Sequence, residues 1–212
     1  MNKLHLYNIE AYQRYKLCEQ ENPNQLSSPL LASPQIIESP GKILYIGQET
    51  NTWGKEINNN FISNLEALYD NFLKNDATNR PYWKFIKGMI NESLYDSVVW
   101  SNLLLCGKKD TLGTPNVSQQ LLELSEDYLY HLYEVSKPRS VVIASSPNSV
   151  YKELINHFFE KVDCDIKDTL STSQPVLVDE EKNIIWTYHP RYLAQSKNTE
   201  KVKTICKKYI NK

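Results

Sequence analysis

The sequence predicts a three-layer α/β/α domain with a central, mostly parallel, four-stranded sheet. Short apolar runs rich in β-forming residues, at 43–46, 97–101 and 140–144, alternate with longer segments whose apolar side chains recur at helical spacing. The 212 residues suit one domain with a single hydrophobic core. Because parallel strands need long crossover connections, this alternation favours a sheet covered by helices on both faces.

The predicted elements follow one another in a regular order. A first helix near residues 4–20 leads into a proline- and serine-rich run at 22–40, which we interpret as an extended loop. Later helices are predicted over 61–73, from Pro81, over 121–135, over 150–158 and over 199–210. Residues 176–178 and 183–188 form either a hairpin or an edge strand followed by a final central strand. We therefore expect one domain over 1–212, with an N-terminal helix and loop at 1–40, a core at 41–195 and a C-terminal helix at 196–212.

Composition and charge narrow the function classes. The formal net charge is −1, so nucleic-acid binding, if present, must rely on local basic patches. Four scattered cysteines have no pairing or histidine spacing typical of a metal site or a disulfide framework. No signal peptide or membrane span is evident, so we expect a cytoplasmic monomer that needs no metal and no cofactor.

Polar side chains stand where the predicted strands end. Gln48 and Glu49 follow the first strand, Asn102 follows the second, and His189 follows the last. Ser145 to Asn148 follow the third. In a parallel sheet, ligands bind beyond the carboxyl ends of the strands, so we expect these residues to share one rim.

A carboxylate, a carboxamide and an imidazole on one rim form a usable set for chemistry. Asn102 can donate and accept along one edge of a heterocycle, Glu49 can activate water or stabilise a cation, and His189 can donate to an oxygen that gains charge. Each has a plainer interpretation: a helix-capping or solvated glutamate, a turn asparagine, and a structural histidine before proline. Their joint placement favours the functional interpretation.

Four segments resemble the uracil-DNA glycosylase superfamily. Residues 43–50 (ILYIGQET) look like its first motif, a strand followed by Gly-Gln-Asp-Pro or Gly-Glu-Ala-Pro, and residues 98–106 (VVWSNLLLC) are similar to the strand that ends in its base-reading asparagine. Residues 137–144 (KPRSVVIA) resemble its next strand, and residues 186–193 (WTYHPRYL) its His-Pro signature. The order and spacing fit over most of the chain, from about residue 41 to 195.

The resemblance implies roles by position. Glu49 stands in place of the aspartate that positions water and balances the positive sugar, Asn102 would bind the flipped base, and His189 would stabilise its carbonyl oxygen. Gln48 would contact the base through its backbone. The stacking partner of the base is Phe61 or Trp53, with core packing as the alternative for Phe61. The residues expected to contact DNA are Arg191, Tyr192, Leu193, Ser145 and Asn148, with Leu193 as the wedge that holds the base out or, alternatively, a packing residue.

Some positions depart from the motifs. Thr50 replaces a proline, and Asn51 falls where the uracil enzymes place the tyrosine that excludes a thymine methyl group. The pocket is therefore expected to admit a five-substituted pyrimidine. Arg191 replaces a serine, which brings a cation to the loop that faces DNA.

Three functions follow as hypotheses. The first is a DNA base glycosylase that removes uracil or another deaminated or modified base from single- or double-stranded DNA, in repair or in phage defence. The second is a non-catalytic module of the same fold that binds nucleic acid or protein. The third is a small-molecule hydrolase or transferase, which the sequence favours least because no nucleophile elbow or phosphate loop is present.

Overall fold

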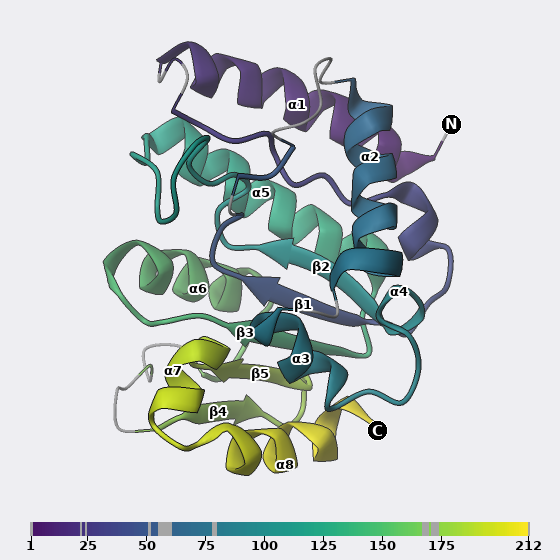
Figure 1. Cartoon of the computed structure of the whole chain (residues 1–212), viewed down its shortest axis with the longest axis vertical. Coiled ribbons are helices and arrows are strands. Elements are labelled where there is room, and N and C mark those ends of the chain that lie inside the picture. Colours follow the sequence, from purple (N-terminus) through teal and green to yellow (C-terminus); the bar gives the residue numbers. More distant parts are fainter. Residues whose placement is uncertain are drawn as a thin grey trace.

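The computed structural model describes the chain except for residues 1, 22, 24, 51, 55–60, 78–79, 167–169, 171–173 and 212 and the side chains of residues 76 and 149. It confirms the predicted α/β/α architecture around a mostly parallel sheet (Figure 1). The strands of this sheet are β1 (Ile43–Gly47), β2 (Val98–Asn102), β3 (Ser140–Ala144), β4 (Val176–Asp179) and β5 (Ile184–Thr187).

The sheet has five strands in the order β2-β1-β3-β5-β4. The four parallel strands are those predicted, and β4 adds an antiparallel edge, so the count of four was one strand short. A tight turn makes this hairpin possible: Asn183 takes a positive φ of 54°, and the Asp179 carboxylate accepts hydrogen bonds from the backbone N–H groups of Lys182 and Asp165, both at 2.9 Å. Both interpretations of residues 176–188 are thus confirmed, since β4 and β5 form a hairpin in which β4 is the edge strand and β5 lies inside the sheet.

Helices cover both faces of the sheet. In Figure 1, α5 (Gln119–Ser136) and α6 (Ser149–Lys161) lie behind it, and α1 (Lys3–Glu21) packs on α5. In front lies α3 (Pro81–Lys87), with α7 (Pro190–Gln195) and α8 (Thr199–Ile210) packed beside it. The remaining helical segments are α2 (Ile62–Asn71), which continues into the π-helical turn η2 (Phe72–Asp76), the short α4 (Leu94–Ser97) and the 3₁₀ turn η1 (Pro34–Ile37). The sequence prediction missed α4, η1 and α7.

The register of the strands decides which residues lie side by side at the carboxyl ends of the sheet. Gly47 at the end of β1 pairs with Asn102 at the end of β2, and Ala144 of β3 pairs with Thr187 of β5. Every described residue of β1, β2, β3 and β5 is buried, as expected of strands covered on both faces. The carboxyl ends of these four strands therefore meet at one rim.

The segment after β2 is hydrogen-bonded to the end of β1. The backbone N–H groups of Leu103 and Leu104 donate to the carbonyl oxygens of Gly47 and Gln48, both at 2.9 Å. Further along, a Cβ atom on Gly107 would lie 1.7 Å from the Thr50 carbonyl oxygen. Only glycine fits there, and Thr50 borders the rim.

We predict that Gly107→Ala destabilises the fold by about 3 kcal/mol or more, because backbone atoms must move to make room for the new methyl group. Urea unfolding followed by tryptophan fluorescence measures this. Gly41→Ala is the control: Gly41 has a φ of 78° and nothing within 4 Å of its added Cβ, so it should cost only about 1 kcal/mol of backbone strain. Equal losses in the two variants would contradict the close approach at Gly107.

Candidate active site

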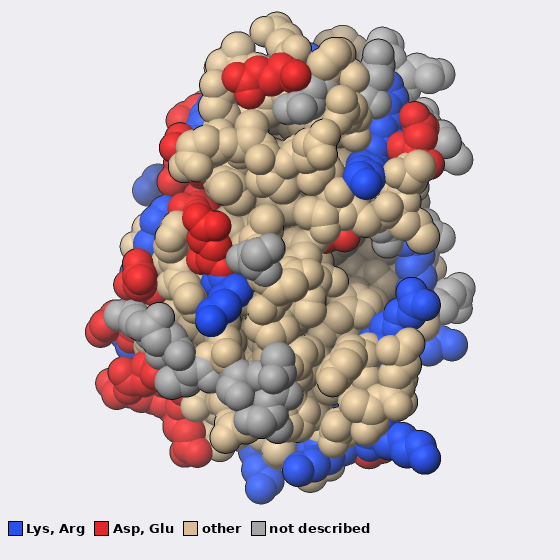
Figure 2. All heavy atoms as spheres, turned by 90° about the vertical axis from the view of Figure 1, so that its left-hand side faces the viewer, with Lys and Arg blue, Asp and Glu red and all other residues tan. Residues whose placement is uncertain are grey.

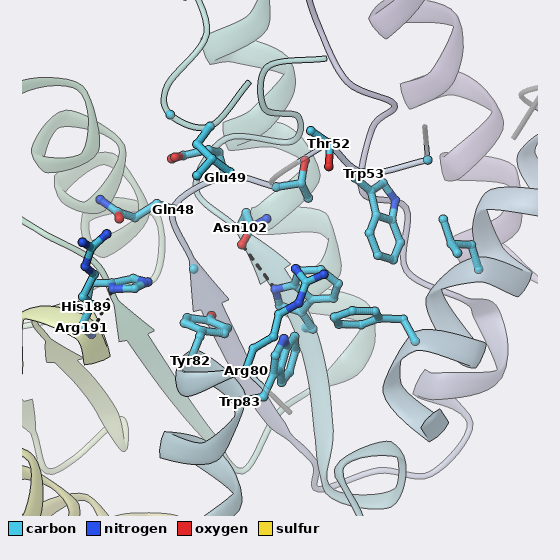
Figure 3. Close-up of a pocket in the computed structure, with 18 residues that line it drawn as sticks. Gln48, Glu49, Thr52, Trp53, Arg80, Tyr82, Trp83, Asn102, His189 and Arg191 are labelled. Atoms are coloured by element: carbon cyan, nitrogen blue, oxygen red, sulfur yellow. Dashed lines mark hydrogen bonds between the residues drawn. The ribbon is translucent and has the colours of Figure 1, made fainter. Parts of the chain in front are cut away.

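A cavity of about 690 Å³ opens at the carboxyl ends of the strands. Its lining includes Gln48, Glu49, Asn102, His189 and Arg191, which come from the ends of β1, β2 and β5 (Figure 3). The cavity size falls in the usual range for small-molecule sites, about 300–1,000 Å³. The structure thus brings together the three residues on which the chemical prediction depended.

Asn102 lies at the centre of the cavity wall and is only 4% exposed. In one orientation its Oδ1 accepts from Trp100 Nε1 at 3.3 Å. With the amide turned over, its nitrogen donates to the Ser101 carbonyl at 3.0 Å and its oxygen accepts from the Thr50 N–H at 3.2 Å. We favour the second orientation because it satisfies both ends of the amide. It leaves one amide hydrogen and one lone pair for a bound molecule.

Gly47 creates the space that Asn102 and Tyr82 occupy. A Cβ atom on Gly47 would lie 2.5 Å from the end of the Asn102 side-chain amide and 2.8 Å from the Tyr82 hydroxyl. The Tyr82 hydroxyl is buried and has no hydrogen-bond partner among the described residues, and burial raises its pKa. It therefore lies next to the Asn102 amide as a buried hydroxyl in the wall of the cavity.

His189 is the N-cap of α7, and its Nδ1 accepts a hydrogen bond from the Arg191 backbone N–H at 3.2 Å. This contact requires an unprotonated Nδ1, so in the neutral ring the proton sits on Nε2. Burial, with a smaller contribution from the Arg191 charge, lowers the pKa of His189. The ring also stacks on Tyr82, with 5.7 Å between centroids. His189 is therefore a neutral hydrogen-bond donor held in a defined orientation.

The Glu49 carboxylate accepts a hydrogen bond from the hydroxyl of Tyr151 on α6, and Tyr151 in turn contacts Thr114 Oγ1 at 2.7 Å. Burial raises the pKa of Glu49, and the Tyr151 hydrogen bond opposes that rise. In Figure 3 the carboxylate points away from the Asn102 amide. Glu49 therefore lines the cavity with its carboxylate held by Tyr151 of α6.

The Gln48 side chain is oriented by a hydrogen bond to a residue that follows β3. Its Nε2 donates to Ser146 Oγ at 2.9 Å, across the rim between the ends of β1 and β3. Its backbone carbonyl accepts from Leu104. The side chain is thus held, while the residue still lines the cavity. Asn51, expected to border the base, lies outside the described residues.

One wall of the cavity is aromatic. Trp53 makes edge contacts with Phe72 and Trp100, with ring centroids 5.4 and 5.3 Å apart, and Trp83 packs edge-on to Trp100 at 4.9 Å. The buried Nε1 of Trp53 has no partner in the described part of the chain. Arg80 borders this wall, with its guanidinium 5.8 Å from the Phe72 ring centre. Such a surface suits a flat, polar heterocycle.

Two of the residues predicted to contact DNA, Leu193 and Ser145, are fully buried and cannot reach DNA in this conformation. Leu193 has no exposed surface because its side chain faces the core beneath α7, so it cannot act as a wedge in this conformation. Ser145 is likewise 0% exposed and hydrogen-bonds within the chain, to Thr187 and Ser146. The sequence pattern gave their place in the chain but not the direction of their side chains.

Three more predicted residues are exposed but do not line the cavity. Phe61 is 64% exposed and begins α2 as its N-cap, so the stacking role predicted for it is not supported, whereas Trp53 lines the cavity. Asn148 is the N-cap of α6, and Tyr192 packs on Tyr188 with 4.5 Å between ring centroids.

Several residues of the site were not predicted from the sequence, among them Arg80, Tyr82, Leu112 and Tyr151 and the aromatic residues Phe72, Trp83 and Trp100. Arg80 and Tyr82 sit at the start of α3, a helix that was predicted but had no motif to connect it with the strand ends. Tyr151 lies a few residues after the polar run that follows β3. This proximity was the one feature of the sequence that could have pointed to Tyr151 as a site residue. No pattern singled out Leu112.

The described residues show no metal-binding cluster beside the cavity residues. In the described residues, no group of three His, Cys, Asp or Glu side chains is arranged to hold a metal ion, and the four cysteines are buried and free.

Figure 2 shows the cavity as a hollow with basic side chains on one side, while acidic side chains gather along the far edge of that face. No helix in the part that the structure describes has the length and apolar character needed to cross a bilayer.

We predict that Tyr151→Phe raises the pKa of Glu49 further, because the hydrogen bond that opposes burial is lost. A carboxyl whose folded-state pKa exceeds its unfolded value contributes stability below the unfolded pKa that is lost as the pH rises through the folded one. The free energy of unfolding should therefore fall more steeply in this variant between about pH 4 and about pH 8. Urea unfolding across that range checks it. Tyr130→Phe on α5 is the control, and equal slopes in both variants would argue against the contact.

We predict that Arg191→Gln raises the pKa of His189 toward, but not to, its ordinary value, because burial persists when the charge is removed. The lowered pKa makes the folded state lose stability as the pH falls from the unfolded value through the folded one, and the variant should soften that loss. Titration of the ring proton by NMR measures the shift. Arg139→Gln, remote from the cavity lining, should leave it unchanged; an unchanged or lower pKa in Arg191→Gln would be the contrary result.

No protein-family model matches the sequence, and the search of curated proteins found no similar one.

Proposed function

We propose that the chain is a DNA base glycosylase that hydrolyses the N-glycosidic bond of a flipped uracil or other deaminated or modified base. The observation that supports this best is the meeting of Asn102, His189 and Glu49 in one cavity, from the ends of three different strands. The resemblance of the same three positions to the uracil-DNA glycosylase motifs agrees with it. The enzyme would act as a cytoplasmic monomer on single- or double-stranded DNA.

The base would lie against the Asn102 amide. Its free hydrogen and lone pair can pair with one edge of a pyrimidine. Stacking of a base on an aromatic side chain is worth about 1–3 kcal/mol, and Trp53 and Trp83 offer such surfaces.

The two ionisable groups would handle opposite charges. As the bond from C1′ to the base nitrogen breaks, its electron pair leaves with the base, and the Nε2–H of neutral His189 stabilises the oxygen that gains charge. The ionised Glu49 stabilises the positive sugar and accepts a proton as water adds to C1′. The departing base takes up a proton from solvent. Burial raises the pKa of Glu49 and so favours its neutral form, whereas the Tyr151 hydrogen bond opposes this rise and favours the ionised form that this role needs.

The cations at the cavity mouth suit the DNA backbone. Arg191 and Arg80 are exposed side chains that line the cavity, the first beside His189 and the second beside Trp83 (Figure 3), and arginine readily contacts phosphate oxygens. Because the overall charge is near zero, local placement of this kind is needed for DNA binding.

One observation favours the second hypothesis, a module that binds DNA without cutting it. The Glu49 carboxylate is held by Tyr151 and points away from Asn102. A module of this kind would bind with an affinity that falls steeply with salt while every base stays attached.

A base-release panel tests the proposal. Oligonucleotides that carry uracil, deaminated purines or modified pyrimidines are incubated with the protein, and abasic sites are then cleaved with alkali. We predict that Asn102→Ala, Glu49→Gln and His189→Ala each lower release by about a hundredfold or more, because each removes a group that acts on the reacting base or sugar. Asn116→Ala, at an exposed asparagine outside the cavity lining, should act like the wild type. No release of any base, or full activity in the three variants, would refute the assignment.

A further inference from the structure

Charge is unevenly divided between the helices on the two faces of the sheet. The layer in front of the sheet consists of α3, α7, α8 and residues 196–198, and we call it the basic layer. It carries one acidic residue and eight cations: Lys84, Lys87, Arg191, Lys197, Lys201, Lys203, Lys207 and Lys208. Behind the sheet, α5 carries four acidic residues and no Lys or Arg, and α6 carries two of each sign. The near-neutral net charge therefore hides one strongly cationic surface.

The basic layer adjoins the cavity. Trp83 of α3 and Arg191 of α7 both line it, and α7 packs against α3 and α8. A Cβ atom on Gly88, at the end of α3, would lie 3.2 Å from Lys203 Nζ of α8. Figure 1 places α8 at the lower end of the molecule, and Figure 2 shows basic side chains at that end and beside the hollow. The cationic surface thus extends from the cavity in one direction.

Helix stability explains only some of these cations. Lysines in the last turns of α3 and α8 complement the negative end of the helix dipole. Lys201, however, lies in the first turn of α8, where a positive charge is unfavourable, and Lys197 lies between α7 and α8. Lys201 and Lys208 are two turns apart, so they share one face of α8. Lys197, Lys201 and Lys208 are all exposed, and no described residue forms an ion pair with any of them.

The acidic groups in or beside the basic layer are few. They are Glu200, which pairs with Lys203 at 2.9 Å, Glu180, which accepts from the Tyr209 hydroxyl at 2.7 Å, Glu92, which is exposed after α3, and Glu49, which is held by Tyr151 in the cavity. Most of these carboxylates already have a partner within the chain. The cations therefore exceed the acids across the layer, and an outside anion can bind them.

We propose that the basic layer binds the phosphates of the DNA strand on one side of the flipped nucleotide, so that the protein holds its substrate asymmetrically. This inference rests on the proposed function. Only a nucleic acid presents a heterocycle for the cavity and a row of phosphates for the adjoining cations in one molecule. The 12 residues of α8 span roughly 18 Å, the rise of about five nucleotides in one strand of a duplex. The side covered by α5 and α6 offers no comparable excess of cations.

Binding to end-placed sites tests the asymmetry on the full chain. Two duplexes of equal length carry a stable abasic-site analogue near the 5′ or near the 3′ end of the target strand, and fluorescence anisotropy measures the affinity without any bond cleavage. The wild type should bind one duplex about tenfold more tightly than the other. The triple variant Lys197→Gln, Lys201→Gln, Lys208→Gln should lose this preference. Its slope of log affinity against log salt should also fall by about one for each lysine removed.

A second triple variant controls for the loss of charge. Lys3→Gln, Lys16→Gln, Lys137→Gln removes three cations from α1 and the end of α5, outside the basic layer, and should behave like the wild type. In the first triple variant the maximal rate of base release at saturating DNA should be unchanged while KM rises, because none of its three lysines lines the cavity.

The outcomes separate the two proposals. Equal affinity of the wild type for both duplexes, or a triple variant that keeps the preference and the salt slope, would overturn the asymmetric binding. So would unchanged DNA binding in a triple variant that has lost affinity for vesicles of phosphatidylcholine and phosphatidylserine, since the layer would then face a membrane. One-sided binding by a wild type that releases no base would support the basic layer and count against the glycosylase assignment alone.

Discussion

The site depends on one close approach, between the ends of β1 and β2. Gly47 and Asn102 are register partners, and the absence of a side chain on Gly47 leaves room for both the Asn102 amide and the Tyr82 hydroxyl. Any larger residue at position 47 would push one of these groups out of the cavity. Because Gly47 has no Cβ atom, the Asn102 amide of β2 and the Tyr82 hydroxyl of α3 can lie close together at the rim of the parallel sheet.

Around this contact the cavity separates into two kinds of surface. The strand ends supply the polar groups, with His189 kept neutral by burial and Glu49 held by Tyr151. Helix α3 and the segment after β1 supply the aromatic wall of Trp53 and Trp83. Binding of a flat heterocycle on the aromatic side would bring its polar edge to Asn102, so recognition and chemistry would occur on opposite sides of one ligand.

The loop after β2 connects the site with the rest of the protein. Its first residues hydrogen-bond to Gly47 and Gln48, its middle carries Leu112, and its second arm reaches Tyr151 through Thr114. The same connection therefore closes the end of β1, borders the cavity and supports the residue that orients Glu49. A ligand that contacts this loop from outside has a short path of hydrogen bonds to the carboxylate.

The sequence by itself determined the sheet and the positions at its carboxyl ends, because strand period and parallel topology decide which residues follow each strand. That was enough to predict Glu49, Asn102 and His189 as neighbours. Tertiary structure alone decided which side chains face the cavity: Leu193 turns into the core, although the residues beside it are exposed, and Tyr82 and Tyr151 arrive from helices far along the chain. Periodicity describes the faces of an element, whereas the direction of a side chain after an element ends depends on what packs against it.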